Sequence, residues 1–257
     1  MKEMSLRLAP STIRTRFTIV RSVLRAAVAD RAIPSDPSSG VVLRRPRKRE
    51  AAMRIPDVEA VGRLLRAADQ PFMPFIALCA FAGLRSGETA GVQLGDIDFM
   101  RRQLTVARQL QRDGRAVAVT PPKYGSEHVV YLPDGVLGML SDLVADTQVD
   151  RRHGNWLFHN RGQPWHNNAV THRWRTTRRR AGLDTVRFHD LRHFYASGLI
   201  ASGCDVVTVQ HALGHDSATT TLSTYAHLWP TAEDRTRAAA ADLLSAASAD
   251  CLWTEAI

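Results

Sequence analysis

The chain has 257 residues and is 44% hydrophobic, so it is long enough to bury a core as one large domain or as one and a half smaller ones. Its 34 basic residues outnumber 25 acidic residues, and the net charge of +9 favours a polyanionic partner, nucleic acid before membrane, although an ordinary basic surface would give the same count. The longest apolar run, residues 72–83, contains Pro74 and is too short to cross a bilayer, so no membrane-spanning segment is expected.

The three cysteines, at positions 79, 204 and 251, have neither the paired spacing of a zinc site nor that of a disulfide framework. The sequence therefore predicts reduced cysteines and no metal centre. The N-terminus also lacks the apolar stretch of a secretion signal, which agrees with a soluble protein in a reducing compartment.

The first fifty residues account for +8 of the net charge of +9, with 12 basic and 4 acidic side chains. An apolar residue recurs every three or four positions from Ile13 to Val28, which predicts an amphipathic helix over 11–31. A turn over 36–40 precedes a basic run that is too charged to pack. We interpret this run as a linker on the DNA backbone, with a plain flexible linker as the alternative; its basic residues are Arg44, Arg45, Arg47, Lys48 and Arg49.

The next part of the chain alternates helical and strand-like patterns. A helix is predicted after Pro56 and a core helix over 71–82, followed by the turn G-L-R-S-G-E at 83–88. Taken alone, Arg85 three residues before Glu88 is most often a structural ion pair. Short apolar runs at 103–107, 116–119 and 129–132 predict a small three-stranded antiparallel sheet, with Lys123 in the turn P-P-K-Y-G-S.

Two further helices are predicted, over 133–147 and 167–181. The second is very basic and has few acidic residues, which favours phosphate or groove contact over a purely solvated face. The arginines that we predict to contact DNA from this helix are Arg173, Arg175, Arg178 and Arg179.

The stretch 188–227 concentrates reactive side chains on consecutive short helices. His189 and Arg192 lie one turn apart on the first helix, which we expect to end at Gly203. Asp205 can cap the next helix, and Leu213-Gly214-His215 closes it. Tyr225 follows ten residues after His215. A guanidinium, imidazoles and a phenol on packed helices suit the binding of a phosphodiester and its attack.

These residues also carry a family resemblance. The blocks H-D-L-R-H at 189–193, L-G-H at 213–215 and T-Y-x-H-L at 224–228 resemble, in order and spacing, the signature of the tyrosine recombinases, the phage integrase family. The turn at 83–88 and the hairpin at 121–126 resemble the family's blocks for an arginine and a lysine. The resemblance implies a six-residue catalytic set of Arg85, Lys123, His189, Arg192, His215 and Tyr225. One departure is His128, where the family commonly has arginine.

The resemblance also implies a fold and a division of the chain. We expect a mainly α protein with a small antiparallel β-sheet, made of a partial helical DNA-binding domain over 1–44, a basic linker over 45–52 and a catalytic domain over 53–257. Because the family commonly carries a complete helical domain before the catalytic one, we expect an N-terminally shortened member.

The implied activity is site-specific cutting and rejoining of DNA strands through a 3′-phosphotyrosyl intermediate, without a cofactor. The expected partners are double-stranded DNA and further copies of the chain, as a tetramer on DNA, in a cytoplasmic, nucleoid-associated location without membrane contact. Three alternatives stay open. The chain could be a DNA-binding protein of the same fold with little activity, or a type IB topoisomerase. The i,i+4 pairs His189/His193 and His211/His215 also permit a metal-dependent hydrolase, although the Glu of H-E-x-x-H is missing, so that we interpret His193 and His211 as structural.

Overall fold

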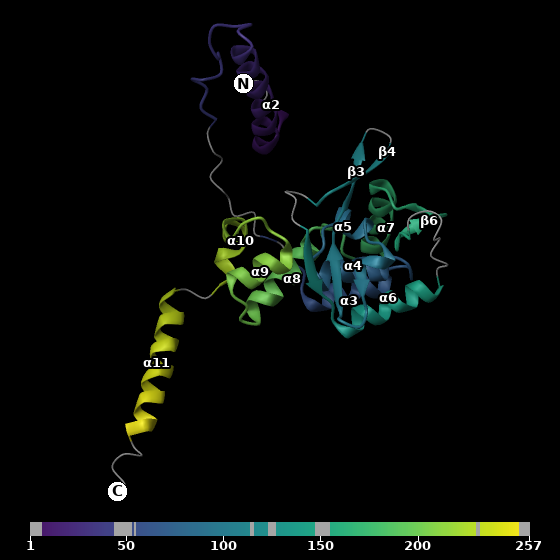
Figure 1. The fold of residues 1–257 in the computed structure, drawn as a ribbon, viewed down its shortest axis with the longest axis vertical. Helices are drawn as coiled ribbons and strands as arrows, with labels where there is room; N and C mark the ends of the chain where they lie inside the picture. The colour runs from purple at the N-terminus through teal and green to yellow at the C-terminus, as the bar shows by residue number, and fades with distance from the viewer. Residues whose placement is uncertain are drawn as a thin grey trace. The chain divides into compact units, whose positions relative to one another are not determined.

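The computed structural model describes residues 7–43, 53, 55–113, 116–122, 127–146, 155–229 and 232–251. The chain divides into two compact units, Met1–Met53 and Arg54–Ile257. Helices dominate both units, and the strands form small antiparallel sheets, which confirms the predicted fold class (Figure 1). No helix in these described ranges is long and apolar enough to cross a membrane.

The first unit contains one long helix, α2 (Pro10–Ala29), as the amphipathic pattern predicts. Pro10 stands at the first helical position, where its missing N–H is not needed. In the segment after the helix, the carboxylate of Asp36 lies 3.9 Å from Nε of Arg21 and accepts hydrogen bonds from the backbone N–H and the hydroxyl of Ser38. Within this unit Val20 is 54% exposed, because a single helix cannot bury its own apolar face.

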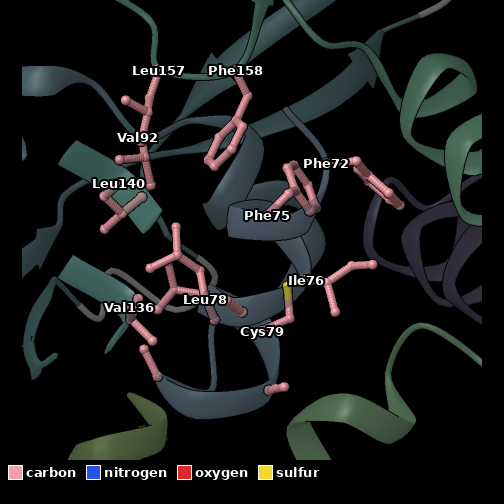
Figure 2. Packing of buried hydrophobic residues seen from close by; sticks show 14 of the residues in the cluster. Phe72, Phe75, Ile76, Leu78, Cys79, Val92, Val136, Leu140, Leu157 and Phe158 are labelled. Atoms are coloured by element: carbon pink, nitrogen blue, oxygen red, sulfur yellow. The ribbon is translucent and has the colours of Figure 1, made fainter. Parts of the chain in front are cut away.

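The core of the second unit forms around the apolar helix α4 (Met73–Phe81), which α3 (Val58–Ala67), α6 (Asp134–Asp146) and α8 (Asp190–Ala201) contact. Figure 2 shows buried side chains from this helix and its neighbours facing one another; those labelled are Phe72, Phe75, Ile76, Leu78, Cys79, Val92, Val136, Leu140, Leu157 and Phe158. The rings of Phe75 and Phe158 meet edge to face, with centroids 4.9 Å apart. This close packing fixes the helices that carry the candidate site.

The remaining helical segments differ in length and charge. They are α5 (Ser86–Ala90), the 3-10 turn η1 (Leu94–Asp96), α7 (Asn167–Arg180), α9 (Val206–Leu213), α10 (Ala218–Tyr225), η4 (Ala226–Leu228) and α11 (Ala232–Cys251). Their ends follow the predicted signals. The carboxylate of Asp205 accepts from the backbone N–H groups of Val207 and Thr208 at the start of α9, and Gly214 ends that helix with φ of 55°.

The strands differ from the prediction in one respect. The three-stranded antiparallel sheet consists of β1 (Ile97–Asp98), β2 (Gln103–Val106) and β5 (His128–Tyr131), in the order β1-β2-β5. The predicted middle strand, residues 116–119, belongs instead to a separate hairpin of β3 (Gln109–Asp113) and β4 (Ala116–Thr120). A second small pair joins β6 (His159–Asn160) to β7 (Gln163–Pro164).

Burial explains this correction. Val130 of β5 is 1% exposed, whereas Val119 of β4 is 53% exposed. The core therefore buries Val130 of β5 together with Leu104 and Val106 of β2. Among the described strands, β4 pairs only with β3, which contacts α5 and α7 (Figure 1). The apolar alternation identified both segments as strands, but their pairing depended on which one the core could bury.

Candidate active site

Arg192 brings three separate parts of the sequence to one place. Its side chain, on α8, is 2% exposed. Nη1 donates a hydrogen bond to the carbonyl oxygen of Gly83, and Nη2 donates one to the carbonyl oxygen of Leu213. The planar fork of a guanidinium suits two acceptors at once. The blocks at 83–88, 189–193 and 213–215, which we singled out separately, therefore meet at this side chain.

Gly83 is required by this close approach. Its φ of 69° lies in the left-handed region, and a Cβ there would lie 2.5 Å from the ring of Tyr195. The next residue but one, Arg85, precedes α5 and is anchored by Glu88. One carboxylate oxygen of Glu88 accepts from Nη1 of Arg85 at 2.6 Å, and the other accepts from its backbone N–H at 2.8 Å. The structural ion pair expected from the spacing is present, and it holds the predicted catalytic arginine.

His215 stands at the start of the segment that joins α9 to α10. Its Nδ1 lies 2.8 Å from the hydroxyl oxygen of Thr221, a residue with no exposed surface. The side chain of Gln210 also donates to the backbone carbonyl of His215 at 3.2 Å. The Thr221 contact orients the imidazole and leaves Nε2 as the nitrogen that can face a ligand, and the Gln210 contact holds the backbone of His215.

Tyr225, the predicted nucleophile, ends α10 and is only 1% exposed. Its hydroxyl lies 2.8 Å from Nδ1 of His193, and the two rings are 5.5 Å apart between centroids. Our interpretation of His193 as a purely structural residue therefore missed this contact. His189, a member of the predicted catalytic set, packs edge to face against His193, with ring centroids 4.6 Å apart. The i,i+4 spacing of the two histidines was the signal that placed both on one side of α8.

The site is positively charged and partly shielded from water, and both properties shift the pKa values of its histidines and of Tyr225. Burial, helped by the charge of Arg192 and then Arg85, lowers the pKa of His215 to about 4. Burial, with the nearby His193, Arg192 and Arg85, lowers the pKa of His189 to about 4, although part of its surface stays exposed. Burial raises the pKa of Tyr225 to about 12, against the charges of the two arginines. At neutral pH both histidines are uncharged and the phenol keeps its proton.

Several predicted residues lie outside the described part of the chain. They are Lys123 and the basic-run residues Arg44, Arg45, Arg47, Lys48 and Arg49. Next to the predicted lysine turn, the side chain of Gln109 donates to the carbonyl oxygen of Pro121 at 2.8 Å, which ties the end of that turn to β3.

The four arginines of α7 that we predicted to contact DNA fall into two groups. Arg173 lies with its guanidinium 4.3 Å from the centre of the Trp165 ring and pairs with Asp69, and Arg178 donates to a backbone carbonyl. Arg175 and Arg179, one turn apart, are exposed. The first pair is held by contacts within the chain, and the second is open to a ligand.

A residue that the sequence analysis treated only as a departure also belongs to this region. His128, on β5, lies with its ring against Gly214, so close that a Cβ on that glycine would be 2.3 Å from Cε1 of the imidazole. The sheet thus contacts the turn that carries His215. Among the described residues, no group of three His, Cys, Asp or Glu side chains is arranged to hold a metal ion.

Comparison with known proteins places this arrangement in a family. The sequence pattern of the phage integrase family matches residues 57–231. The chain is 25% identical to the ICEBs1 integrase of Bacillus subtilis over 232 residues, 87% of the chain and 63% of the relative. It is 31% identical to the tyrosine recombinase XerD of Bifidobacterium longum over 229 residues, 84% of the chain and 70% of the relative.

Solved structures show the same fold. The Tn1549 transposon integrase in complex with a circular intermediate DNA matches 94% of this chain and 82% of its own, with a TM-score of 0.73 and 20% identity. The XerA recombinase matches 73% of this chain and 68% of its own, with a TM-score of 0.54 and 23% identity. The fold is that of the tyrosine recombinases. The chain belongs to the phage integrase family. It spans 63% of the length of the B. subtilis integrase and 55% of the integrase of Salmonella phage P22.

Proposed function

We propose that the chain is a site-specific DNA recombinase that cuts and rejoins strands through a covalent link between Tyr225 and DNA. The observation that carries this proposal is the convergence of Arg85, Arg192, His215 and Tyr225 from four segments, with the charges of both arginines acting on the tyrosine hydroxyl. Membership of the phage integrase family supports it, as do the names of the relatives, which are integrases and recombinases.

The chemistry follows from the charges. A phosphodiester is an anion that gathers further charge on its nonbridging oxygens in the transition state, and preorganised guanidinium groups stabilise that charge. Arg85, with Arg192 beside it, would supply them, and Nε2 of His215 would donate a hydrogen bond to the phosphate. Removing one such donor typically slows the reaction by about 10²–10³. The bond energy stays in the protein–DNA link, so no nucleotide cofactor is required.

The covalent step conserves the number of phosphodiester bonds. The oxygen of Tyr225 bonds to phosphorus, and the bond from phosphorus to the 5′ oxygen breaks. We propose that Lys123 protonates this leaving oxygen. We also propose that His189, next to Arg85 and Arg192, assists the cleavage step. A different 5′-hydroxyl then reverses the reaction and releases the tyrosine, which joins two new ends.

The partners follow from the charge. We propose double-stranded DNA as the substrate, contacted by Arg175 and Arg179 of α7 and by the basic run that precedes the second unit. Arg173 and Arg178 remain in the proposed contact set, although both also make contacts within the chain. Strand exchange between two sites requires several active sites, so we propose a tetramer on DNA, in the cytoplasm and associated with the nucleoid.

The test is covalent capture. A library of nicked duplexes with randomised sequence is incubated with the full chain, and DNA that stays bound under denaturing conditions is recovered and sequenced. The expected result is an adduct on a defined site, which Tyr225→Phe abolishes while DNA binding persists. An adduct that survives Tyr225→Phe would move the nucleophile, with Tyr195 the next candidate. Binding without any adduct would indicate a DNA-binding protein with the same fold.

Adduct formation on the same captured duplex also distinguishes the recombinase from the metal-dependent hydrolase. Because guanidinium groups supply the positive charge that divalent ions supply in two-metal nucleases, adduct formation should survive excess EDTA. Complete loss that zinc or magnesium restores would instead support a metal-dependent hydrolase. Relaxation of supercoiled plasmids that lack the captured site would support a topoisomerase.

A further inference from the structure

The hydrogen bond between His193 and Tyr225 has no role in the mechanism described so far. Nδ1 of His193 lies 2.8 Å from the phenolic oxygen, within direct hydrogen-bonding distance. The imidazole is half-buried and the tyrosine is almost fully buried, so little water can compete for this contact. His193 is therefore the described titratable group that touches the attacking atom.

We propose that His193 accepts the proton of Tyr225 when the phenol attacks the phosphodiester, and returns it when the tyrosine leaves. The proposal rests on the proposed function and adds a residue to it. In the forward step the O–H bond of Tyr225 breaks, the proton moves to Nδ1, and the phenolic oxygen bonds to phosphorus as the 5′ oxygen leaves. In the reverse step the imidazolium gives this proton back to the phenolic oxygen.

The electrostatics of the pair suit this transfer. Burial raises the pKa of Tyr225, so the phenol holds its proton until the step begins. Burial lowers the pKa of His193, and the charges of Arg192 and Arg187 act in the same direction, so the imidazole is neutral at pH 7 and keeps a lone pair. Asp190, one turn earlier and 7% exposed, acts in the opposite direction and favours the imidazolium that the transfer creates.

The geometry also separates the two histidines of α8. The ring of His189 packs against His193, and Arg85 is among the groups that lower the pKa of His189. The arrangement places His189 beside His193 and within reach of the charges of Arg192 and Arg85, and it places His193 next to the tyrosine. We infer that His189 faces the phosphate and that His193 faces the nucleophile.

The first test needs no DNA. In the full chain labelled with ¹⁵N histidine, the nitrogen shifts of His193 show which ring nitrogen carries the proton, and spectra of His193→Asn and Tyr225→Phe assign them. A base at Tyr225 requires an Nδ1 without a proton at pH 7, with the proton on Nε2. Tyr225→Phe should then shift the Nδ1 resonance. A protonated Nδ1 that donates to the tyrosine would overturn the proposal.

The second test measures single-turnover adduct formation on the nicked duplex that the wild-type chain captures. His193→Asn places an amide near the position of Nδ1, so it keeps a hydrogen bond but cannot take a proton. Loss of a general base slows a step by about 10²–10⁴, and we expect a decrease in that range. The matched control is His211→Asn, an exposed histidine on α9, which should cleave at the wild-type rate.

A chemical rescue distinguishes a proton acceptor from a merely structural contact. Fluorinated tyrosine at position 225 has a more acidic phenol and depends less on a base, so it should restore much of the rate of His193→Asn. A duplex with sulfur at the 5′ leaving position should not, because sulfur relieves only the need for an acid. His193→Asn within about twofold of wild type, failed rescue by fluorotyrosine, or rescue by sulfur would each refute the assignment.

The outcomes also separate this proposal from the one on which it rests. If the wild-type chain forms an adduct through Tyr225 and His193→Asn forms it equally fast, only the role of His193 is wrong. If no adduct forms through Tyr225, the proposed function fails as well. Should His193→Asn fold poorly, as judged by its melting temperature, His193→Gln and the nitrogen shifts of the wild-type chain decide the question.

Discussion

The guanidinium of Arg192 donates to the carbonyl oxygen of Leu213, 21 residues away on the next helix. Because its other terminal nitrogen donates to Gly83, 109 residues away, this buried side chain organises the site as well as charging it. Burial lowers the pKa of Arg192 to about 10, against the charge of Glu88, and leaves it a cation at neutral pH. Arg85 has no such bridging role, since its described partner is Glu88.

This difference predicts unequal effects of two matched substitutions. Lysine cannot donate to both carbonyl groups from one nitrogen with the geometry of the fork. Arg192→Lys should therefore lower the free energy of unfolding by about 1–3 kcal/mol, the penalty for a buried acceptor left unpaired, and should also abolish adduct formation. Arg85→Lys should lose activity with a smaller change in stability. Urea unfolding and the capture assay measure both quantities, and equal destabilisation would contradict the bridging role.

Thr221 should matter through His215. Its hydroxyl lies against Nδ1 of the imidazole, and Thr221→Val removes the hydroxyl with little change in shape. Without this partner the imidazole can rotate or change tautomer, so we expect adduct formation to slow by about tenfold or more. Thr224→Val is the control, because that hydroxyl, on the same helix, donates only to the carbonyl of Thr220. A wild-type rate for Thr221→Val would show that His215 is positioned by other groups.

The histidines predict how stability depends on pH. The folded state holds His189 and His215 at a pKa of about 4, below the ordinary value of 6.5, so between these limits the unfolded chain binds more protons. Their contribution is therefore fully present above pH 6.5 and is lost as the pH falls toward 4. Urea midpoints at several pH values should show this decline, and His215→Gln should flatten it.

The arginines of α7 predict a separable effect on DNA binding. Each phosphate contact contributes about 0.9 to the slope of log affinity against log salt. Replacing the exposed Arg175 and Arg179 together with alanine should lower the magnitude of that slope by about 0.9 to 1.8, which corresponds to one to two phosphate contacts. The stability of the chain should change little. Arg173→Ala should mainly destabilise the chain, because its guanidinium packs on Trp165 and pairs with Asp69. Fluorescence anisotropy on the captured duplex measures the slopes, and equal slopes for the double variant and Arg173→Ala would refute the division.

Local physics accounts for what the sequence predicted well. Local sequence patterns identified α2, α4, α7 and α8, and the capping residues Asp205 and Gly214 placed the ends of α9. These features depend on residues that are close in the sequence, so their periodicity and capping signals can be recognised from the sequence alone. The pairing of β4 was wrong for the opposite reason. Alternation marks a strand but does not say which partner it finds, and the buried position went to β5.

The sequence by itself determined which side chains could carry the chemistry, because Arg192, His215 and Tyr225 stand in blocks whose order and spacing resemble one family. Only the tertiary structure decided which of them touch. His189 and His193 are equivalent in spacing, yet His193 contacts Tyr225, since the packing of α10 against α9 and α9 against α8 sets where the phenol lies. A contact between residues 32 positions apart depends on how helices pack, and helix packing depends on many distant side chains at once, which no local pattern contains.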